Sequence, residues 1–213
     1  MVTPVDASGG QMTPLTTRRF ILGGLIAIGL TTRAFAGLDD GLAAYHRGDY
    51  ATAYRELAAA AAGGVPLAQY NLARMYFSGE GVSRDNAEGS KWLRKAAVSG
   101  VGPAQYQLGA SYEWGIDVTQ DYGEAARWYR LAADRGVPVA QYRLGLLYIN
   151  GTGVARDPVA AHMWLNLAAA RLAPGEPRNA VASLRESVAA TMTAAQVAQA
   201  QAAARNWAPT EDR

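Results

Sequence analysis

A single spacing of 36 residues organises this chain. Tryptophan recurs at that interval, at Trp92, Trp128 and Trp164. The triplet Ala-Gln-Tyr does the same, beginning at Ala68, Ala104 and Ala140. A fixed period of this length is typical of stacked supersecondary units, none of which can bury its apolar face alone. The sequence therefore predicts a repeat array, a class of fold that usually presents a binding surface.

Each repeat has the pattern of two antiparallel helices. In the first repeat, Ala68, Leu72 and Tyr76 recur at helical spacing and form one apolar face. A second helix is predicted to begin near Asp85, which can cap it, and to end at Gly100. One position is small in all three repeats, which predicts a close helix crossing. Its residues are Ala73, Gly109 and Gly145.

The loop inside each repeat contains glycines that look like the start of a phosphate-binding loop. The first repeat has Gly79-Glu80-Gly81 and the third has Gly151-Thr152-Gly153, whereas the second has Gly115-Ile116-Asp117. Because these glycines follow a helix and not a strand, tight turns with positive φ explain them better. An aspartate follows each loop, at Asp85, Asp121 and Asp157. We interpret these aspartates as helix caps and not as acid–base pairs.

The repeated pattern resembles the Sel1-like repeat, a relative of the tetratricopeptide repeat. The first copy runs AQYNLARMYFSGEGVSRDNAEGSKWLRKAAVSG, from Ala68 to Gly100. The resemblance covers three repeats, at residues 65–100, 101–136 and 137–172, and implies an all-α, right-handed α-solenoid of antiparallel helix pairs. Residues 37–64 look like a tetratricopeptide-style helix pair that opens the array. Residues 173–213 are predicted to form capping helices and a short tail, because a terminal repeat needs a polar outer face.

The first 36 residues have the features of a secretory signal. Arg18 and Arg19 precede an apolar stretch, residues 20–30, and Ala34-Phe35-Ala36 ends the segment as a small-x-small cleavage site. The paired arginines resemble a twin-arginine signal, and an ordinary secretion signal is the alternative. We expect cleavage after Ala36 and a periplasmic or secreted protein. The apolar stretch is much shorter than the ~20 residues that a membrane-spanning helix needs, so no stable membrane insertion is expected afterwards.

Composition narrows the class of partner. The chain has no cysteine, so disulfides, thiolate metal sites and cysteine nucleophiles are excluded. Its formal net charge of +2 comes from the signal segment, and residues 37–213 balance 17 basic against 17 acidic residues. A nucleic-acid partner is therefore not expected. A protein or peptide partner of unknown identity is expected instead, and the sequence does not indicate the oligomeric state.

In tetratricopeptide arrays the first helix of each repeat lines the concave groove, and the resemblance places the same positions there in this chain. The groove-facing set is Leu67, Tyr70, Arg74, Phe77, Pro103, Tyr106, Ala110, Glu113, Val139, Tyr142, Leu146 and Ile149. From this set we take as candidate partner contacts Tyr70, Arg74, Phe77, Tyr106, Glu113, Tyr142 and Leu146. Arg74 could hold a carboxylate. The alternatives are a solvated surface for Arg74 and Glu113, and scaffold packing for the tyrosines.

No motif in the sequence predicts catalysis, a metal or a cofactor. The only histidines are His46 and His162, and neither has metal-ligand spacing. Some Sel1-like proteins are linked to β-lactam or peptidoglycan chemistry, but those are braced by disulfides, and this chain has no cysteine. We therefore expect an exported, non-enzymatic adaptor that binds a protein or peptide in its groove. The alternatives are a peptidoglycan- or carbohydrate-binding envelope protein and, less favoured, a cell-wall enzyme.

Overall fold

A computed structural model describes residues 37–210 of the chain. This part is all-helical, with no strand, as the sequence predicts. A helical segment over 37–46 comes first. The helices that follow are α2 (Tyr50–Ala62), α3 (Pro66–Ser78), α4 (Asn86–Val98), α5 (Gly102–Trp114), α6 (Tyr122–Asp134), α7 (Pro138–Asn150), α8 (Pro158–Arg171), α9 (Glu176–Ala189) and α10 (Ala194–Asn206). The predicted signal segment, residues 1–36, lies outside the described residues.

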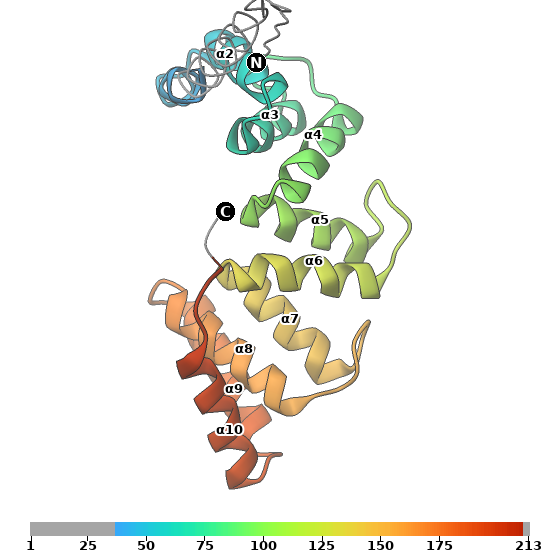
Figure 1. The fold of residues 1–213 in the computed structure, drawn as a ribbon, viewed down its shortest axis with the longest axis vertical. Helices are drawn as coiled ribbons and strands as arrows, with labels where there is room; N and C mark the ends of the chain where they lie inside the picture. Colours follow the sequence, from blue (N-terminus) through green and yellow to red (C-terminus); the bar gives the residue numbers. More distant parts are fainter. Residues whose placement is uncertain (1–36, 211–213) are drawn as a thin grey trace, which may run out of the picture.

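The helices stack in chain order as an α-solenoid (Figure 1). The three repeats are the pairs α3–α4, α5–α6 and α7–α8, and each pair also packs on the next. The turns that join one repeat to the next lie at the left of Figure 1, and the loops inside the second and third repeats lie at the right. Helices α9 and α10 both pack on α8 and so close the array. This arrangement confirms the predicted architecture of helix pairs.

The aspartates that follow the loops are caps, as predicted. The Asp85 carboxylate accepts a hydrogen bond from the Glu88 amide at 2.9 Å, and Asp121 and Asp157 make the same kind of bond at the starts of α6 and α8. At the last helix, Thr193 and Gln196 form a reciprocal capping box. Each such bond satisfies a backbone N–H that has no partner within its own helix. The boundaries therefore arise from local chemistry repeated every 36 residues.

The small residues inside the repeats let the paired helices touch. A Cβ on Gly109 would lie 2.8 Å from the ring of Tyr129 on α6, and a Cβ on Gly145 would lie 3.0 Å from Leu165 on α8. Both distances are shorter than ordinary carbon contacts. Around these crossings lies the core, in which Trp128 and Trp164 are buried and Trp92 is half-buried. The first tryptophan is thus less enclosed than the other two.

The segment after α10 returns along the array and contacts the second repeat (Figure 1). The Trp207 ring packs edge-on against Trp164, with centroids 6.5 Å apart. The Arg171 guanidinium lies 4.4 Å from the centre of the Trp207 ring. Further along, the Thr210 amide donates to the Asp134 carbonyl at 2.8 Å. The end of the described chain therefore fastens α10 to the junction between the second and third repeats.

Candidate functional site

The first helix of each repeat is α3, α5 or α7, and Arg74 lies on the exposed surface of these first helices, on α3 near the start of the array. Its Nη1 donates to Asn71 Oδ1 at 3.4 Å, and its guanidinium lies 5.8 Å from the centre of the Tyr45 ring. The Tyr45 hydroxyl in turn donates to Glu80 Oε2 at 2.7 Å. Hydrogen bonds from Tyr45 and Ser78 hold the pKa of Glu80 below its ordinary value. Arg74 is therefore an accessible cation beside an aromatic ring and an ionised carboxylate.

The next two candidates take part in packing between helices. Tyr70 is half-buried, and its hydroxyl accepts a hydrogen bond from Gln107 Nε2 on α5 at 3.3 Å. Phe77 turns toward α4, where a Cβ on Gly89 would come within 2.7 Å of its ring. The position of Phe77, expected to face the groove, thus faces the second helix of its own repeat. Neither side chain is a freely projecting groove residue.

Glu113 is held inside a cluster formed by three helices. The Tyr129 hydroxyl of α6 donates to Glu113 Oε2 at 2.5 Å, and Arg143 Nη1 of α7 lies 3.6 Å from Glu113 Oε1. Only 12% of the Glu113 side chain is exposed. Burial and the bond to Glu113 raise the pKa of Tyr129 far above its ordinary value. The Tyr106 ring packs on that of Tyr129, with centroids 5.7 Å apart. Tyr106 and Glu113 therefore belong to one internal network.

The last two candidates, Tyr142 and Leu146, are half-buried on α7. Tyr142 packs against the apolar cluster that α8 and α9 share. The closing helix α9 therefore encloses the part of the third repeat that Tyr142 faces.

Sequence reasoning missed two residues on the outward side of the glutamate cluster. Trp114 is 60% exposed, and the Arg143 guanidinium lies 5.7 Å from the centre of its ring. Arg143 has equivalents in Asn71 and Gln107, so this position is polar in every repeat and different in each. That variation between repeats is a signal that could have identified Arg143. Arg143 contacts the exposed aromatic ring as well as the Glu113 carboxylate, and the exposed surface carries Arg74, Trp114 and Arg143.

The described residues give little support for a metal site or a membrane span. Across residues 37–210, no group of three His, Asp or Glu side chains is placed to hold a metal ion. No helix in that part of the chain is long and apolar enough to cross a bilayer. His162 is buried on α8, with 3% exposure and with Nδ1 lacking a hydrogen-bond partner among the described residues.

His162 is expected to make the fold sensitive to acid. Burial, and secondly the charge of Arg185, lower the pKa of His162 below its ordinary value. Since the unfolded chain then binds a proton before the folded chain does, the free energy of unfolding should fall as pH drops below about 6.5. The slope for one proton is at most about 1.4 kcal/mol per pH unit.

Urea unfolding at pH 7.5 and 5.5 measures this effect. His162→Gln should reduce the loss of stability between the two pH values, whereas His46→Gln, at an exposed histidine, should leave it as in the wild type. An unchanged pH dependence in His162→Gln would contradict the prediction.

Known proteins share this arrangement of repeated helix pairs. The Sel1 repeat family model matches residues 66–100, 102–137 and 138–171. A crystal structure of a Sel1 repeat protein from Oxalobacter formigenes is 40% identical, covers 59% of this chain and 93% of its own, and superposes with a TM-score of 0.56. The chain belongs to the Sel1 repeat family. A search of curated proteins gave no significant match.

A second Sel1-type structure extends the comparison over more of the chain. It is c5321, described as a protective antigen present in uropathogenic Escherichia coli strains and displaying an SLR fold, with 26% identity and a TM-score of 0.56. The match covers 82% of this chain but only 45% of that protein. Sel1 repeat proteins are generally scaffolds for protein interactions. The outward surface of the first helices, with Arg74, Trp114 and Arg143, is therefore the candidate functional site.

Proposed function

We propose that this Sel1 repeat protein is an exported, non-enzymatic adaptor that binds a segment of a partner protein along its first helices. The observation that carries the proposal is that this surface bears side chains that differ between repeats, namely the exposed Arg74 and Trp114 and the half-buried Arg143. The positions that repeat, such as Trp128 and Trp164, are buried in the scaffold. A partner would therefore meet a pattern that changes along the array, which is what selective binding needs.

Export to the periplasm or beyond is part of this proposal. It is supported by the sequence of residues 1–36, with paired arginines and the Ala34-Phe35-Ala36 site. A protective antigen among the structural neighbours is consistent with a protein that antibodies can reach. Fusion of residues 1–36 to a reporter that is active only outside the cytoplasm tests this part, and Arg18→Lys/Arg19→Lys distinguishes the twin-arginine route from ordinary secretion.

Arg74→Glu is expected to weaken capture of an acidic partner segment by about tenfold or more, because it reverses the charge that would hold a carboxylate. Crosslinked affinity capture of residues 37–213 from an envelope extract, read by quantitative mass spectrometry, measures the loss. Arg55→Glu is the matched control, since Arg55 is also exposed but lies on α2 beside Glu56. A partner retained by wild type and Arg55→Glu, but lost from Arg74→Glu, supports the proposal. Equal loss from both variants contradicts it.

A glycan partner is a second candidate, favoured by one observation. The Trp114 ring is 60% exposed and could stack on a sugar. The two candidates differ in their salt dependence, because a contact made by Arg74 is screened by added salt, whereas stacking on Trp114 is hardly affected. Retention of peptidoglycan fragments that persists in salt and disappears in Trp114→Ala would favour the glycan and overturn the peptide proposal.

A further inference from the structure

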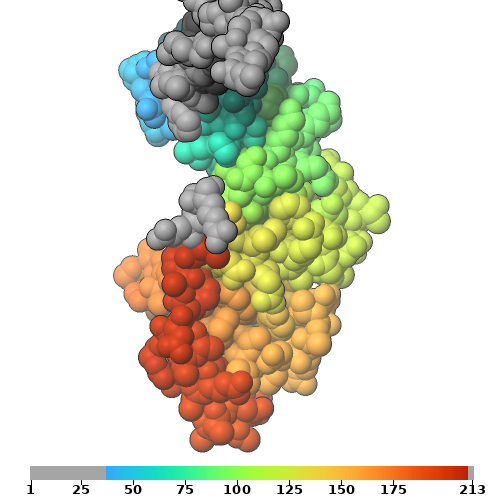
Figure 2. All heavy atoms as spheres, viewed as in Figure 1, coloured from blue at the N-terminus to red at the C-terminus, as the bar shows by residue number. Residues whose placement is uncertain are grey.

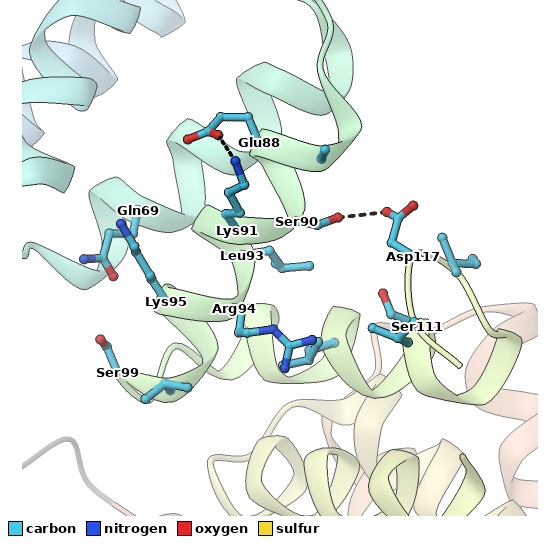
Figure 3. A pocket seen from close by; sticks show the side chains of 15 residues that line it. Gln69, Glu88, Ser90, Lys91, Leu93, Arg94, Lys95, Ser99, Ser111 and Asp117 are labelled. Carbon is cyan, nitrogen blue, oxygen red and sulfur yellow. Dashed lines mark hydrogen bonds and ion pairs between the residues drawn. The ribbon is translucent and has the colours of Figure 1, made fainter. Parts of the chain in front are cut away.

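A hollow of about 710 Å³ lies between α4 and the loop that joins α5 to α6 (Figure 3). Its walls come mainly from the exposed side of α4 and from Ile116, Asp117 and Val118 of the loop. None of the groove candidates lines it. In the space-filling view, α4 and the loop lie at the right of the molecule (Figure 2). The hollow therefore belongs to a different surface from the proposed groove.

The hollow occurs where the repeat pattern breaks. In the first repeat, a Cβ on Gly81 would lie 2.2 Å from the Tyr50 carbonyl oxygen, and in the third, a Cβ on Gly153 would lie 2.1 Å from the Tyr122 carbonyl oxygen. Those two loops therefore rest directly on the first residue of the preceding second helix. Both glycines also have positive φ, of 73° and 70°. No residue with a side chain could take the same place.

The second repeat has Asp117 at this position, and its loop cannot rest on α4 in the same way. The residue of α4 that corresponds to Tyr50 and Tyr122 is Asn86. Asp117 keeps the left-handed backbone, with φ of 58°, but its Oδ2 accepts a hydrogen bond from Ser90 Oγ at 2.8 Å. Ser90 lies one helical turn beyond Asn86. The Cβ of Asp117 thus accounts for the space between the loop and α4.

The hollow has an apolar floor and an apolar rim. Leu93 and Leu108, both 4% exposed, lie beneath it. Val98 and Ile116, which are 72% and 54% exposed, stand at its edges. An aliphatic side chain placed between them would remove apolar surface from water, at about 25 cal/mol per Å² of area. The volume lies within the range of pockets that hold small ligands or anchoring side chains.

Three cations and two carboxylates, those of Glu88 and Asp117, line the hollow, and the excess of positive charge favours an anion. Of its three cations, Lys91 is paired with Glu88 at 2.8 Å. Arg94 instead donates to the Tyr112 hydroxyl at 3.4 Å, and the Lys95 ammonium lies 3.9 Å from the centre of the Trp92 ring. Among residues 37–210, neither Arg94 nor Lys95 has a carboxylate partner. The equivalents of Lys95 are Leu131 and Leu167, so this charge is particular to α4.

We infer that this hollow is a second docking site, which binds an acidic peptide segment of a partner protein through an aliphatic anchor. The anchor would lie on Leu93 and Leu108, and the carboxylates would meet Arg94 and Lys95. A protein segment fits better than a free small acid, because the hollow combines an apolar floor and the exposed Val98 and Ile116 with two cations, so its occupant needs aliphatic groups as well as carboxylates.

Fluorescence anisotropy with a labelled hexapeptide, in which two glutamates flank a Leu-Ile pair on each side, tests the inference. Wild type should bind it, and binding should weaken with added salt. The double variant Arg94→Glu/Lys95→Glu should bind at least about tenfold more weakly. Arg130→Glu is the matched control, because Arg130 is the equivalent of Arg94 and bonds Tyr148 as Arg94 bonds Tyr112. Its affinity should equal that of wild type.

Asp117→Gly is the sharpest variant, because it removes the Cβ that keeps the loop off α4. The loop should then close as its two equivalents do, and peptide binding should fall at least about tenfold. The stability of this variant should remain close to that of wild type, so misfolding does not explain the loss. No binding by wild type, full binding by Asp117→Gly, or equal loss in Arg130→Glu and the double variant would each overturn the inference.

Discussion

Trp128→Ala is expected to lower the free energy of unfolding by about 3–5 kcal/mol, as large-to-small changes at buried aromatic positions do. The ring is 5% exposed and packs in a cluster with Ala73, Leu93 and Leu108, which brings helices of the first two repeats together. Its loss would leave a cavity at the junction of two repeats, where each repeat depends on its neighbour for burial. Urea unfolding followed by circular dichroism measures the change.

Trp92→Ala provides the matched control for this prediction. Trp92 has the same position in the preceding repeat, but its ring is half-buried and Lys95 lies over it. Less apolar surface is removed from water there, so its replacement should cost clearly less than that of Trp128. An equal or larger loss in Trp92→Ala would show that enclosure against the first repeat is not what makes Trp128 important.

The fold could be predicted because each repeat gives independent evidence on the same unit. A single aspartate before a helix is a weak signal, but Asp85, Asp121 and Asp157 at equal spacing indicate a cap in every copy. Gly109 and Gly145 likewise indicate one crossing geometry. These features depend on neighbours in sequence or within one helix pair, so a periodic pattern is enough to reveal them.

The candidate site was harder to predict, because it depends on how one repeat is placed on the next. A helix turns by about 100° per residue, so one position separates a groove residue from a packed one. Glu113 was expected to face the groove, yet it meets Tyr129 and Arg143, whereas its neighbour Trp114 is exposed. The Glu113–Arg143 pair joins two repeats, and no spacing within one repeat indicates it.

The hollow beside α4 shows another limit of the sequence. The substitution of Asp117 for the glycine of the other loops is visible in the sequence. Its consequence is not, since it is inferred from contacts between residues more than 30 positions apart, namely Gly81 with the Tyr50 carbonyl oxygen and Gly153 with that of Tyr122. A break in the repeat pattern can thus be found by aligning the repeats. Its effect on the loop depends on distances between atoms, which the sequence does not give.

Gly153→Ala is expected to lower the free energy of unfolding by at least about 2 kcal/mol, for two separate reasons. A left-handed backbone with a Cβ costs about 1–2 kcal/mol, and φ at Gly153 is 70°. In addition, the new Cβ would lie 2.1 Å from the Tyr122 carbonyl oxygen, so the loop must lift off α6. Thermal and urea unfolding measure the sum.

Gly48→Ala separates the two contributions, because φ at Gly48 is 79° but nothing lies within 4 Å of its Cβ position. This variant should show the backbone cost alone, and Asp117→Gly should stay within about 1 kcal/mol of wild type. Equal losses in Gly153→Ala and Gly48→Ala would mean that the loop does not rest on α6. In that case Asp117 would not be what holds the second loop away from α4. The reason is that the same clash, between a Cβ at this loop position and the helix beneath it, is invoked for Gly153→Ala and for Asp117.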